Sequence, residues 1–144
     1  PALAPLSQRV TFMGSHGAGQ VTKLCNQLIV AANAVLIGEA IALAEKAGVD
    51  ASKLAPALAG GFADSKPFQL LAPRMSTHQF EPVQWRVKTL LKDLDTAVNH
   101  ANALGLQTPV AVQAAHRLRS HSDNGFSESD LSSLIELFTP SAIS

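Results

Sequence analysis

One long apolar stretch dominates the pattern of hydrophobic and polar positions along the chain. It covers residues 20–47, where alanine, leucine and isoleucine are frequent and polar side chains are few. Gly19 precedes this stretch and Gly48 follows it, while Lys46 stands where the negative end of a helix dipole favours a cation. The pattern predicts one helix over residues 20–47, roughly 40 Å long.

Shorter helical segments follow, each bounded by capping residues, glycine or proline. They are expected over residues 51–59 after Asp50, from Lys66 to about Met75, over 83–104, over 110–120, and in a last segment that ends near Phe138. Pro73 predicts a kink or an early end of the second segment. Ser127 and Asp130 have the spacing of a capping box for the last one. The expected fold class is therefore all-α, with one long central helix.

The first residues differ from the rest. Residues 1–8 have the pattern of a helix tail, residues 9–13 that of a short strand, and Gly14 that of a turn. A single strand has no sheet to join in an all-helical domain. We therefore expect residues 1–14 to be the tail of a preceding domain and a hinge, and residues 15–144 to form the helical domain.

The apolar stretch from 28 to 44 is nearly long enough to span a bilayer, but polar residues interrupt its centre. Asn33, Gly38 and Glu39 argue against a membrane segment. A helix that is apolar around most of its circumference must be covered on most sides, by its own domain or by another subunit. We therefore expect a homodimer or homotetramer through this helix, and expect Asn33 and Glu39 to form hydrogen bonds across a helix interface.

Composition and charge exclude several classes of partner. Hydrophobic residues make up 47% of the 144, enough for the core of one domain, and 11 basic residues balance 11 acidic ones. A neutral chain has no general attraction for nucleic acid or anionic membranes. The single Cys25 cannot form an internal disulfide, and no leader peptide opens the chain, so we expect a cytoplasmic protein. We expect Cys25 to be a small buried residue.

The histidines give no sign of a metal site. The five histidines lack the spacing of zinc ligands, and one cysteine does not supply it, so no bound metal is expected. His16 lies inside a glycine-rich turn. Contact with a substrate or a cofactor phosphate is one interpretation of His16, and simple loop exposure is the favoured one.

The segment GSHGAGQVTKLCNQ at residues 14–27 has three glycines in six positions. A phosphate-binding P-loop would need lysine where Gln20 stands. A dinucleotide-binding fingerprint would need a small residue at Thr22 and an acidic residue about 20 positions later at the end of a strand, where the long helix still continues. The local pattern therefore leaves a flexible hinge that leads into the helix.

Three polar side chains follow this hinge within an otherwise apolar helix. Lys23, Asn26 and Gln27 are spaced i, i+3 and i+4, so they share one face. A solvated stripe near a helix end is the simplest interpretation. A lysine donor beside two carboxamides is also suited to hold and protonate a small carbonyl acid.

A second polar group lies on the predicted helix 83–104. Lys88 and Lys92 are four residues apart, and Asp95 lies near Lys92 at i+3. Such a pattern is typical of a surface ion-pair stripe. Asp93 is expected to orient a neighbouring group or to accept from a local donor.

These motifs together resemble a known enzyme family. GAGQVTKLCNQ at 17–27 resembles the GxGxxxKxxNN/Q signature of the β-hydroxyacid dehydrogenases, the family of 3-hydroxyisobutyrate dehydrogenase and tartronate semialdehyde reductase. The likeness continues through LIVAAN at 28–33, GEAIALAEKAGVD at 38–50 and LKDLD at 91–95, and covers about residues 9 to 138. Gln27 and the glycine pair at 60–61 resemble the tartronate semialdehyde reductase branch.

The resemblance implies a two-domain enzyme. An N-terminal Rossmann domain would hold NAD or NADP, and an all-α domain of the 6-phosphogluconate dehydrogenase-like type, which this chain resembles, would complete the active site. The implied catalytic acid/base is Lys23, and Asn26 and Gln27 would position substrate oxygens. Lys92 would lie near the nicotinamide, and Trp85 stands where family members often have phenylalanine, in the lining of the substrate pocket.

The implied reaction is hydride transfer between a nicotinamide and a small hydroxy acid. Reduction of tartronate semialdehyde to glycerate is the favoured version, and oxidation of 3-hydroxyisobutyrate is the second. A non-catalytic helical dimerisation module is a further alternative, against which the presence of Lys23, Asn26 and Lys92 argues. The isolated chain is expected to be inactive, because the cofactor would be bound mainly by the other domain.

Overall fold

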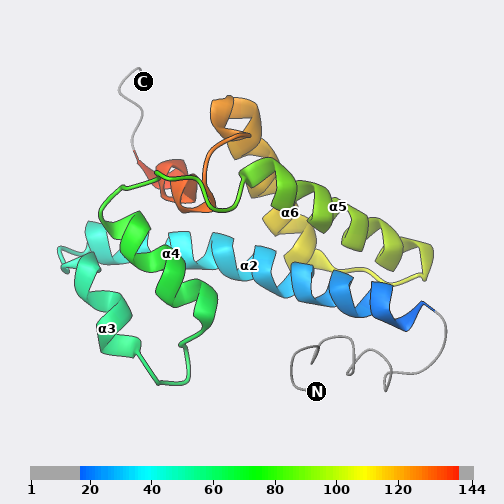
Figure 1. The fold of residues 1–144 in the computed structure, drawn as a ribbon, viewed down its shortest axis with the longest axis horizontal. Helices are drawn as coiled ribbons and strands as arrows, with labels where there is room; N and C mark the ends of the chain where they lie inside the picture. Colours follow the sequence, from blue (N-terminus) through cyan, green and yellow to red (C-terminus); the bar gives the residue numbers. More distant parts are fainter. Residues whose placement is uncertain (1–16, 140–144) are drawn as a thin grey trace.

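A computed structural model describes residues 17–139, in which shorter helices pack against one long helix (Figure 1). The elements are α2 (Ala18–Lys46), the 3-10 helix η1 (Ala51–Lys53), α3 (Leu54–Leu58), α4 (Lys66–Ser76), α5 (Val87–Ala103), α6 (Pro109–His121), the π-helical turn η2 (Ser122–Phe126) and the 3-10 helix η3 (Leu131–Phe138). Within residues 17–139 there is no strand, and one isolated bridge joins Arg86 to Asp130. The all-α prediction is confirmed. The expected strand at 9–13 and the hinge at 1–14 lie outside the described residues, as does His16.

Helix α2 is the central element. It begins after Gly17, whose φ of 92° lies in the left-handed region that favours glycine, and it ends before Gly48 with φ of 80°. One face packs against α4, α5, α6 and η3. Within the described part of the chain α2 alone is long and apolar enough to cross a membrane, but these contacts are those of a core helix.

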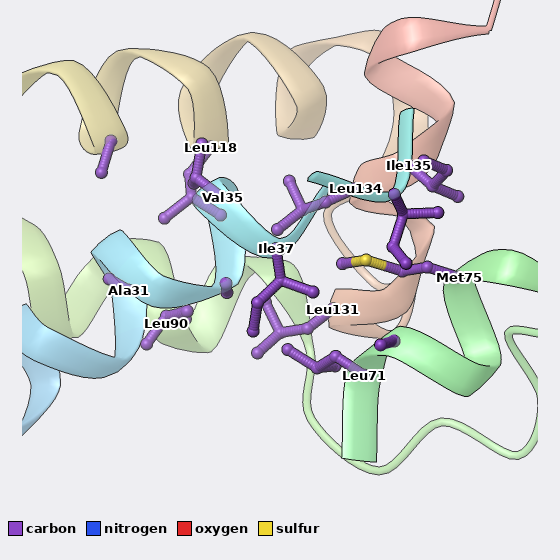
Figure 2. Packing of buried hydrophobic residues seen from close by; sticks show 14 of the residues in the cluster. Ala31, Val35, Ile37, Leu71, Met75, Leu90, Leu118, Leu131, Leu134 and Ile135 are labelled. Carbon is purple, nitrogen blue, oxygen red and sulfur yellow. The ribbon is translucent and has the colours of Figure 1, made fainter. Parts of the chain in front are cut away.

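The core is made of aliphatic side chains from all the elements that touch α2 (Figure 2). Its fully buried members include Ile41, Met75, Leu90, Leu118 and Leu134, one from each of five elements. Gly38 allows η3 to approach α2 closely, since a Cβ at this position would stand 3.3 Å from the Phe138 ring. Truncation of a buried leucine in such a core typically destabilises a protein by about 2–5 kcal/mol.

A buried carboxylate, Asp130, organises the segment before α5. It accepts hydrogen bonds from the backbone N–H groups of Gln84 (2.8 Å) and Trp85 (3.1 Å), and it forms an ion pair with Arg74 (2.8 Å). Gln84 and Trp85 lie in a bend, Arg86 is extended, and α5 begins at Val87. The predicted helix start at residue 83 is wrong because this distant carboxylate takes the N–H groups that would open the helix.

Asp130 also caps the last helix. Its carboxylate accepts from the backbone N–H and the hydroxyl of Ser132. The last segment is a 3-10 helix capped by Asp130, so the predicted capping box with Ser127 at its start is wrong. In α4, Ser65 is the cap, and the helix continues past Pro73 to Ser76, so the predicted early end is also wrong.

His121 is a structural residue of the core. Its side chain is 1% exposed, stacks on Phe126 with ring centroids 4.2 Å apart, and shares a hydrogen bond of 2.8 Å with Ser133. Burial lowers the pKa of His121 to about 4, so the ring is neutral at pH 7.

Substitution of Asp130 by asparagine tests how much this carboxylate stabilises the fold. Burial opposes the charged form of Asp130, but hydrogen bonds from Ser132, Gln84 and Trp85 outweigh burial and lower its pKa. An asparagine side chain at this position would leave Arg74 without its anion and replace an acceptor by a donor. We expect Asp130→Asn to lower the free energy of unfolding by about 3 kcal/mol in urea titrations at pH 7.

The exposed Asp123 provides the matched control. Asp123→Asn is expected to change the free energy of unfolding by less than about 0.5 kcal/mol. Folding lowers the pKa of Asp130. The wild-type chain therefore exceeds Asp130→Asn in free energy of unfolding by the full amount above about pH 4, and this difference shrinks as the pH falls through the pKa that Asp130 has in the folded state. Equal stability of the two variants at pH 7 would contradict the role given to Asp130.

Candidate active site

The polar residues predicted from the sequence lie in the first turns of α2. Lys23, Asn26 and Gln27 follow the left-handed turn at Gly17 by about two to three helical turns. The N-terminal end of a helix carries a partial positive charge, which favours anions nearby. The structure confirms that these three residues share one helical segment at the end of the domain nearest Gly17.

A chain of hydrogen bonds connects this segment to α5. Asn26 Nδ2 donates to Gln27 Oε1 at 2.9 Å, and Gln27 Nε2 donates to Asp93 Oδ2 at 2.8 Å. Gln27 is 9% exposed, so its amide is fixed by both bonds inside the contact between α2 and α5. Asp93 thus orients a neighbouring group, as predicted. Its partner lies 66 residues earlier and could not be identified from the sequence.

The two lysines flank this hydrogen-bonded chain. Lys23 lies one turn before Gln27 on α2, and Lys92 directly precedes Asp93 on α5. Both lysines are exposed, and within residues 17–139 neither ammonium group has a hydrogen bond or an ion pair. The contact between α2 and α5 therefore brings Lys23, Asn26, Gln27 and Lys92 to one region, with both charges available to a ligand.

The ion pairs of α5 differ from the predicted stripe. Asp95 pairs with Arg119 of α6, and not with Lys92. Lys88 pairs with Glu128 at the surface, where both side chains are more than half exposed. Packing of α6 and of the segment before η3 brings these partners close, and both are distant in the sequence. Of the two lysines of α5, Lys92 is thus the one whose ammonium group is free of partners in the described part of the chain.

Trp85 lies in the segment before α5, beside a later part of α2 than the polar cluster. It lines a hollow of about 250 Å³ together with Val30, Leu71 and Arg74. Val30 is one turn beyond Asn26, so the hollow adjoins the cluster without containing Lys23. Trp85 is about one third exposed and is held through its backbone by Asp130. The Arg74–Asp130 pair that supports it was missed by sequence reasoning, since its two residues are 56 positions apart.

The structure bears on expectations about three other residues of α2. Cys25 is exposed and not buried as expected, because it lies on the outer side of the first turns, where no other described element covers α2. Asn33 and Glu39 form no hydrogen bond across a helix interface within residues 17–139 of one chain, so a bond across an interface between subunits stays a prediction. Both instead line an open groove beside α6. Over the same range, no three His, Cys, Asp or Glu side chains are grouped as metal ligands.

The arrangement is suited to bind a small anion and to move a proton. A free ammonium group at Lys23 can donate a proton, and the exposed Asn26 amide can bind a carboxylate or hydroxyl oxygen. Gln27 and Asp93 hold Asn26 in place, and the hydrogen bond between Gln27 and Asp93 uses the groups that each would need to bind a ligand. Their bonds make Gln27 a positioning residue in this structure.

The chain is similar in sequence to known dehydrogenases and reductases. A sequence model described as the NAD-binding domain of NADP-dependent 3-hydroxyisobutyrate dehydrogenase matches residues 17–138. The 2-hydroxy-3-oxopropionate reductase of Escherichia coli is 35% identical over 136 residues, which cover 94% of this chain and 46% of that protein. A probable mitochondrial 3-hydroxyisobutyrate dehydrogenase-like protein of Arabidopsis thaliana is 34% identical over 84% of this chain and 37% of its own length.

Solved structures give the same result. The 3-hydroxyisobutyrate dehydrogenase of Salmonella typhimurium superposes with a TM-score of 0.80 at 25% identity, over 85% of this chain and 43% of that one. The enzyme of the same name from Mycobacterium tuberculosis, solved with L-serine, superposes with a TM-score of 0.79 at 25% identity, over 89% of this chain and 46% of that one. The chain thus spans about half the length of the proteins it matches. It belongs to the 3-hydroxyisobutyrate dehydrogenase family, within the region that the family model describes as NAD-binding.

Proposed function

We propose that this chain is the helical, substrate-binding part of an NAD(P)-dependent oxidoreductase that transfers a hydride between a nicotinamide and a small hydroxy acid. The observation that carries the proposal is the fixed Asn26–Gln27–Asp93 chain between Lys23 and Lys92, whose ammonium groups have no partner within residues 17–139. The relatives are about twice as long as this chain. Their length supports the proposal that a second domain of the same protein holds most of the cofactor.

The favoured substrate pair is tartronate semialdehyde and glycerate. It is supported by the relative named 2-hydroxy-3-oxopropionate reductase and by Gln27, the residue that resembles this branch of the family. A 3-hydroxyisobutyrate dehydrogenase is the second candidate, favoured by the names of both solved structures. A purely structural module is disfavoured, because a module without chemistry gives no reason for two such lysines beside a buried amide chain.

In the reducing direction, Lys23 supplies the proton. As hydride reaches the carbonyl carbon, the carbon–oxygen π pair moves to the oxygen, which becomes anionic. The oxygen then takes a proton from Nζ of Lys23, which is left as a neutral amine, and the product is the alcohol. Asn26 holds the substrate carboxylate or a hydroxyl group, and the positive end of α2 favours the same anion.

In this proposal the described residues contact the nicotinamide end of the cofactor. A reduced nicotinamide, when bound, supplies the hydride. Lys92, an exposed donor next to Asp93, is the residue we propose to contact that end. The described residues otherwise offer no glycine-rich turn between a strand and a helix for the phosphates.

Substitution of Lys23 tests the proton donor in the longer protein that carries this chain. Lys23→Met keeps the length of the side chain and removes the ammonium group. We expect kcat to fall by about 10²- to 10⁴-fold, the usual contribution of a positioned acid/base group. Lys46, exposed at the other end of α2, provides the control, and Lys46→Met is expected to leave kcat within about two-fold. Comparable rates for the two variants would remove Lys23 from the mechanism.

The role of Asp93 can be separated from a structural one by comparison with Asp95. Asp93→Asn removes the charge that orients Gln27, so we expect KM for the hydroxy acid to rise about ten-fold while kcat changes less. Asp95→Asn breaks only the surface pair with Arg119 and should leave both constants unchanged. The account of Asp93 fails if the steady-state constants of the two variants agree.

The cofactor assignment predicts weak binding by this chain alone. Calorimetric titration of the 144-residue chain with NAD(H) and with NADP(H) should give dissociation constants above about 1 mM, since one lysine and a nicotinamide contact leave most of the cofactor in solvent. Micromolar binding of either cofactor would show that the helical domain holds more of it than proposed.

A further inference from the structure

His78 connects three elements at the end of α2 that is farthest from Lys23. It lies in the loop just after α4. Its ring Nδ1 is 2.9 Å from Oε2 of Glu136 in η3, and its Nε2 is 3.2 Å from Oε2 of Glu45 in the last turn of α2. Glu45 lies roughly 33 Å from Lys23 along this helix, at about 1.5 Å per residue. The His78 contact is therefore separate from the proposed active site.

The backbone of His78 has a conformation that is usual for glycine. Its φ of 53° lies in the left-handed region, at the position after the C-cap of α4. The N–H of His78 donates to the carbonyl of Met75 at 3.1 Å. The N–H of Gln79 donates to the carbonyl of Arg74 at 2.9 Å, which completes a Schellman motif. This turn ends α4, and a histidine stands at its left-handed position.

The two contacts of the ring are satisfied together only when the ring is protonated. An imidazolium donates from both nitrogens, whereas a neutral imidazole donates from one and presents a lone pair at the other. A neutral ring would therefore direct a lone pair at a carboxylate oxygen of Glu45 or Glu136. The side chains of these two glutamates have no other partner within residues 17–139. Glu45 also lies at the negative end of the α2 dipole, where a neighbouring cation is favourable.

The surrounding charges favour the protonated ring. The hydrogen bond with Glu136 is the largest cause that raises the pKa of His78, burial opposes it, and the hydrogen bond and charge of Glu45 add to the rise. Four basic side chains come from the elements around this contact: Lys46 beside His78 in an open hollow of about 250 Å³, Arg74 paired with Asp130, Arg117 over the Phe138 ring, and the buried, neutral His121. Lys46 is exposed, so solvent screens its repulsion of the ring.

We propose that His78 is a pH-sensitive bridge, whose protonated ring holds η3 and the loop after α4 to the end of α2 and whose neutral ring releases one of the two carboxylates. Above about pH 5 both glutamates are ionised. The bridge then contributes fully to stability up to about pH 6.5, the ordinary histidine value, because the ring is charged in the folded and the unfolded chain. Its contribution is lost as the pH rises through the folded pKa, which is the higher of the two.

The bridge acts on one end of the segment that joins α4 to α5. His78 holds the first residues of this segment, and Asp130 binds the N–H groups of Gln84 and Trp85 near its end. The pKa of Asp130 is lowered, so this carboxylate stays charged above pH 6. A rise from pH 6 to pH 9 therefore loosens the contact at His78 and leaves the contact at Trp85 unchanged.

Urea unfolding of the 144-residue chain at pH 6 and pH 9 tests the bridge. His78→Asn removes the titrating ring, and asparagine tolerates the left-handed backbone. We expect this variant to raise the equilibrium constant for unfolding about five-fold at pH 6 and less than about two-fold at pH 9. His116 is exposed on α6 without a partner in the described range, so His116→Asn should have the same effect at both pH values. An effect of His78→Asn that does not change with pH would overturn the proposal.

An NMR titration of the ring protons identifies the group that titrates. The midpoint for His78 should lie above 6.5, the ordinary value. Glu136→Gln removes the carboxylate at Nδ1 and should lower this midpoint, while Glu128→Gln, which breaks surface pairs with Arg86 and Lys88, should not move it. A midpoint for His78 at or below 6.5, or an equal midpoint in the two variants, would contradict the bridge.

Discussion

The hydrogen bond from Gln27 to Asp93 is the contact on which the proposed active site depends. It joins α2 to α5 at a point where each helix carries a lysine that has no partner within residues 17–139. The buried amide of Gln27 donates from its nitrogen to Asp93 and accepts at its oxygen from Asn26. Only one orientation of this amide makes both bonds, so the contact with Asp93 fixes the orientation of two carboxamides. Without Asp93, no hydrogen bond would link Lys23 and Asn26 on α2 to the part of α5 that carries Lys92.

The buried and the exposed face of α2 differ in what they contact. The inner face packs the core, and its first turns bring the polar residues to α5. The outer face presents a row of exposed aliphatic side chains, Ile29, Leu36 and Leu43. This division explains why the helix is apolar around most of its circumference. A single chain covers only one side of it.

The sequence predicted the elements better than their contacts. The bounds of α2 were predicted from Gly19 and Gly48 to within two residues, because glycine acts locally on the backbone, but the helix begins after Gly17, so Gly19 lies inside it. The start of α5 was predicted four residues too early, because Asp130, more than 40 residues away, binds the N–H groups of Gln84 and Trp85. In the site, i, i+3 and i+4 spacing placed Lys23, Asn26 and Gln27 together, whereas the exposure of Cys25 and the partner of Asp95 depend on how other helices pack.

The most direct test of the central claim is a crystal structure of the proposed longer protein with oxidised nicotinamide cofactor and a small 2- or 3-hydroxy acid bound. The account predicts that Nζ of Lys23 lies about 3 Å from the hydroxyl oxygen on the carbon that loses hydride, with Asn26 bonded to the acid and Gln27 still bonded to Asp93. A complex in which that oxygen is bound by other groups, with Lys23 directed to solvent, would contradict it.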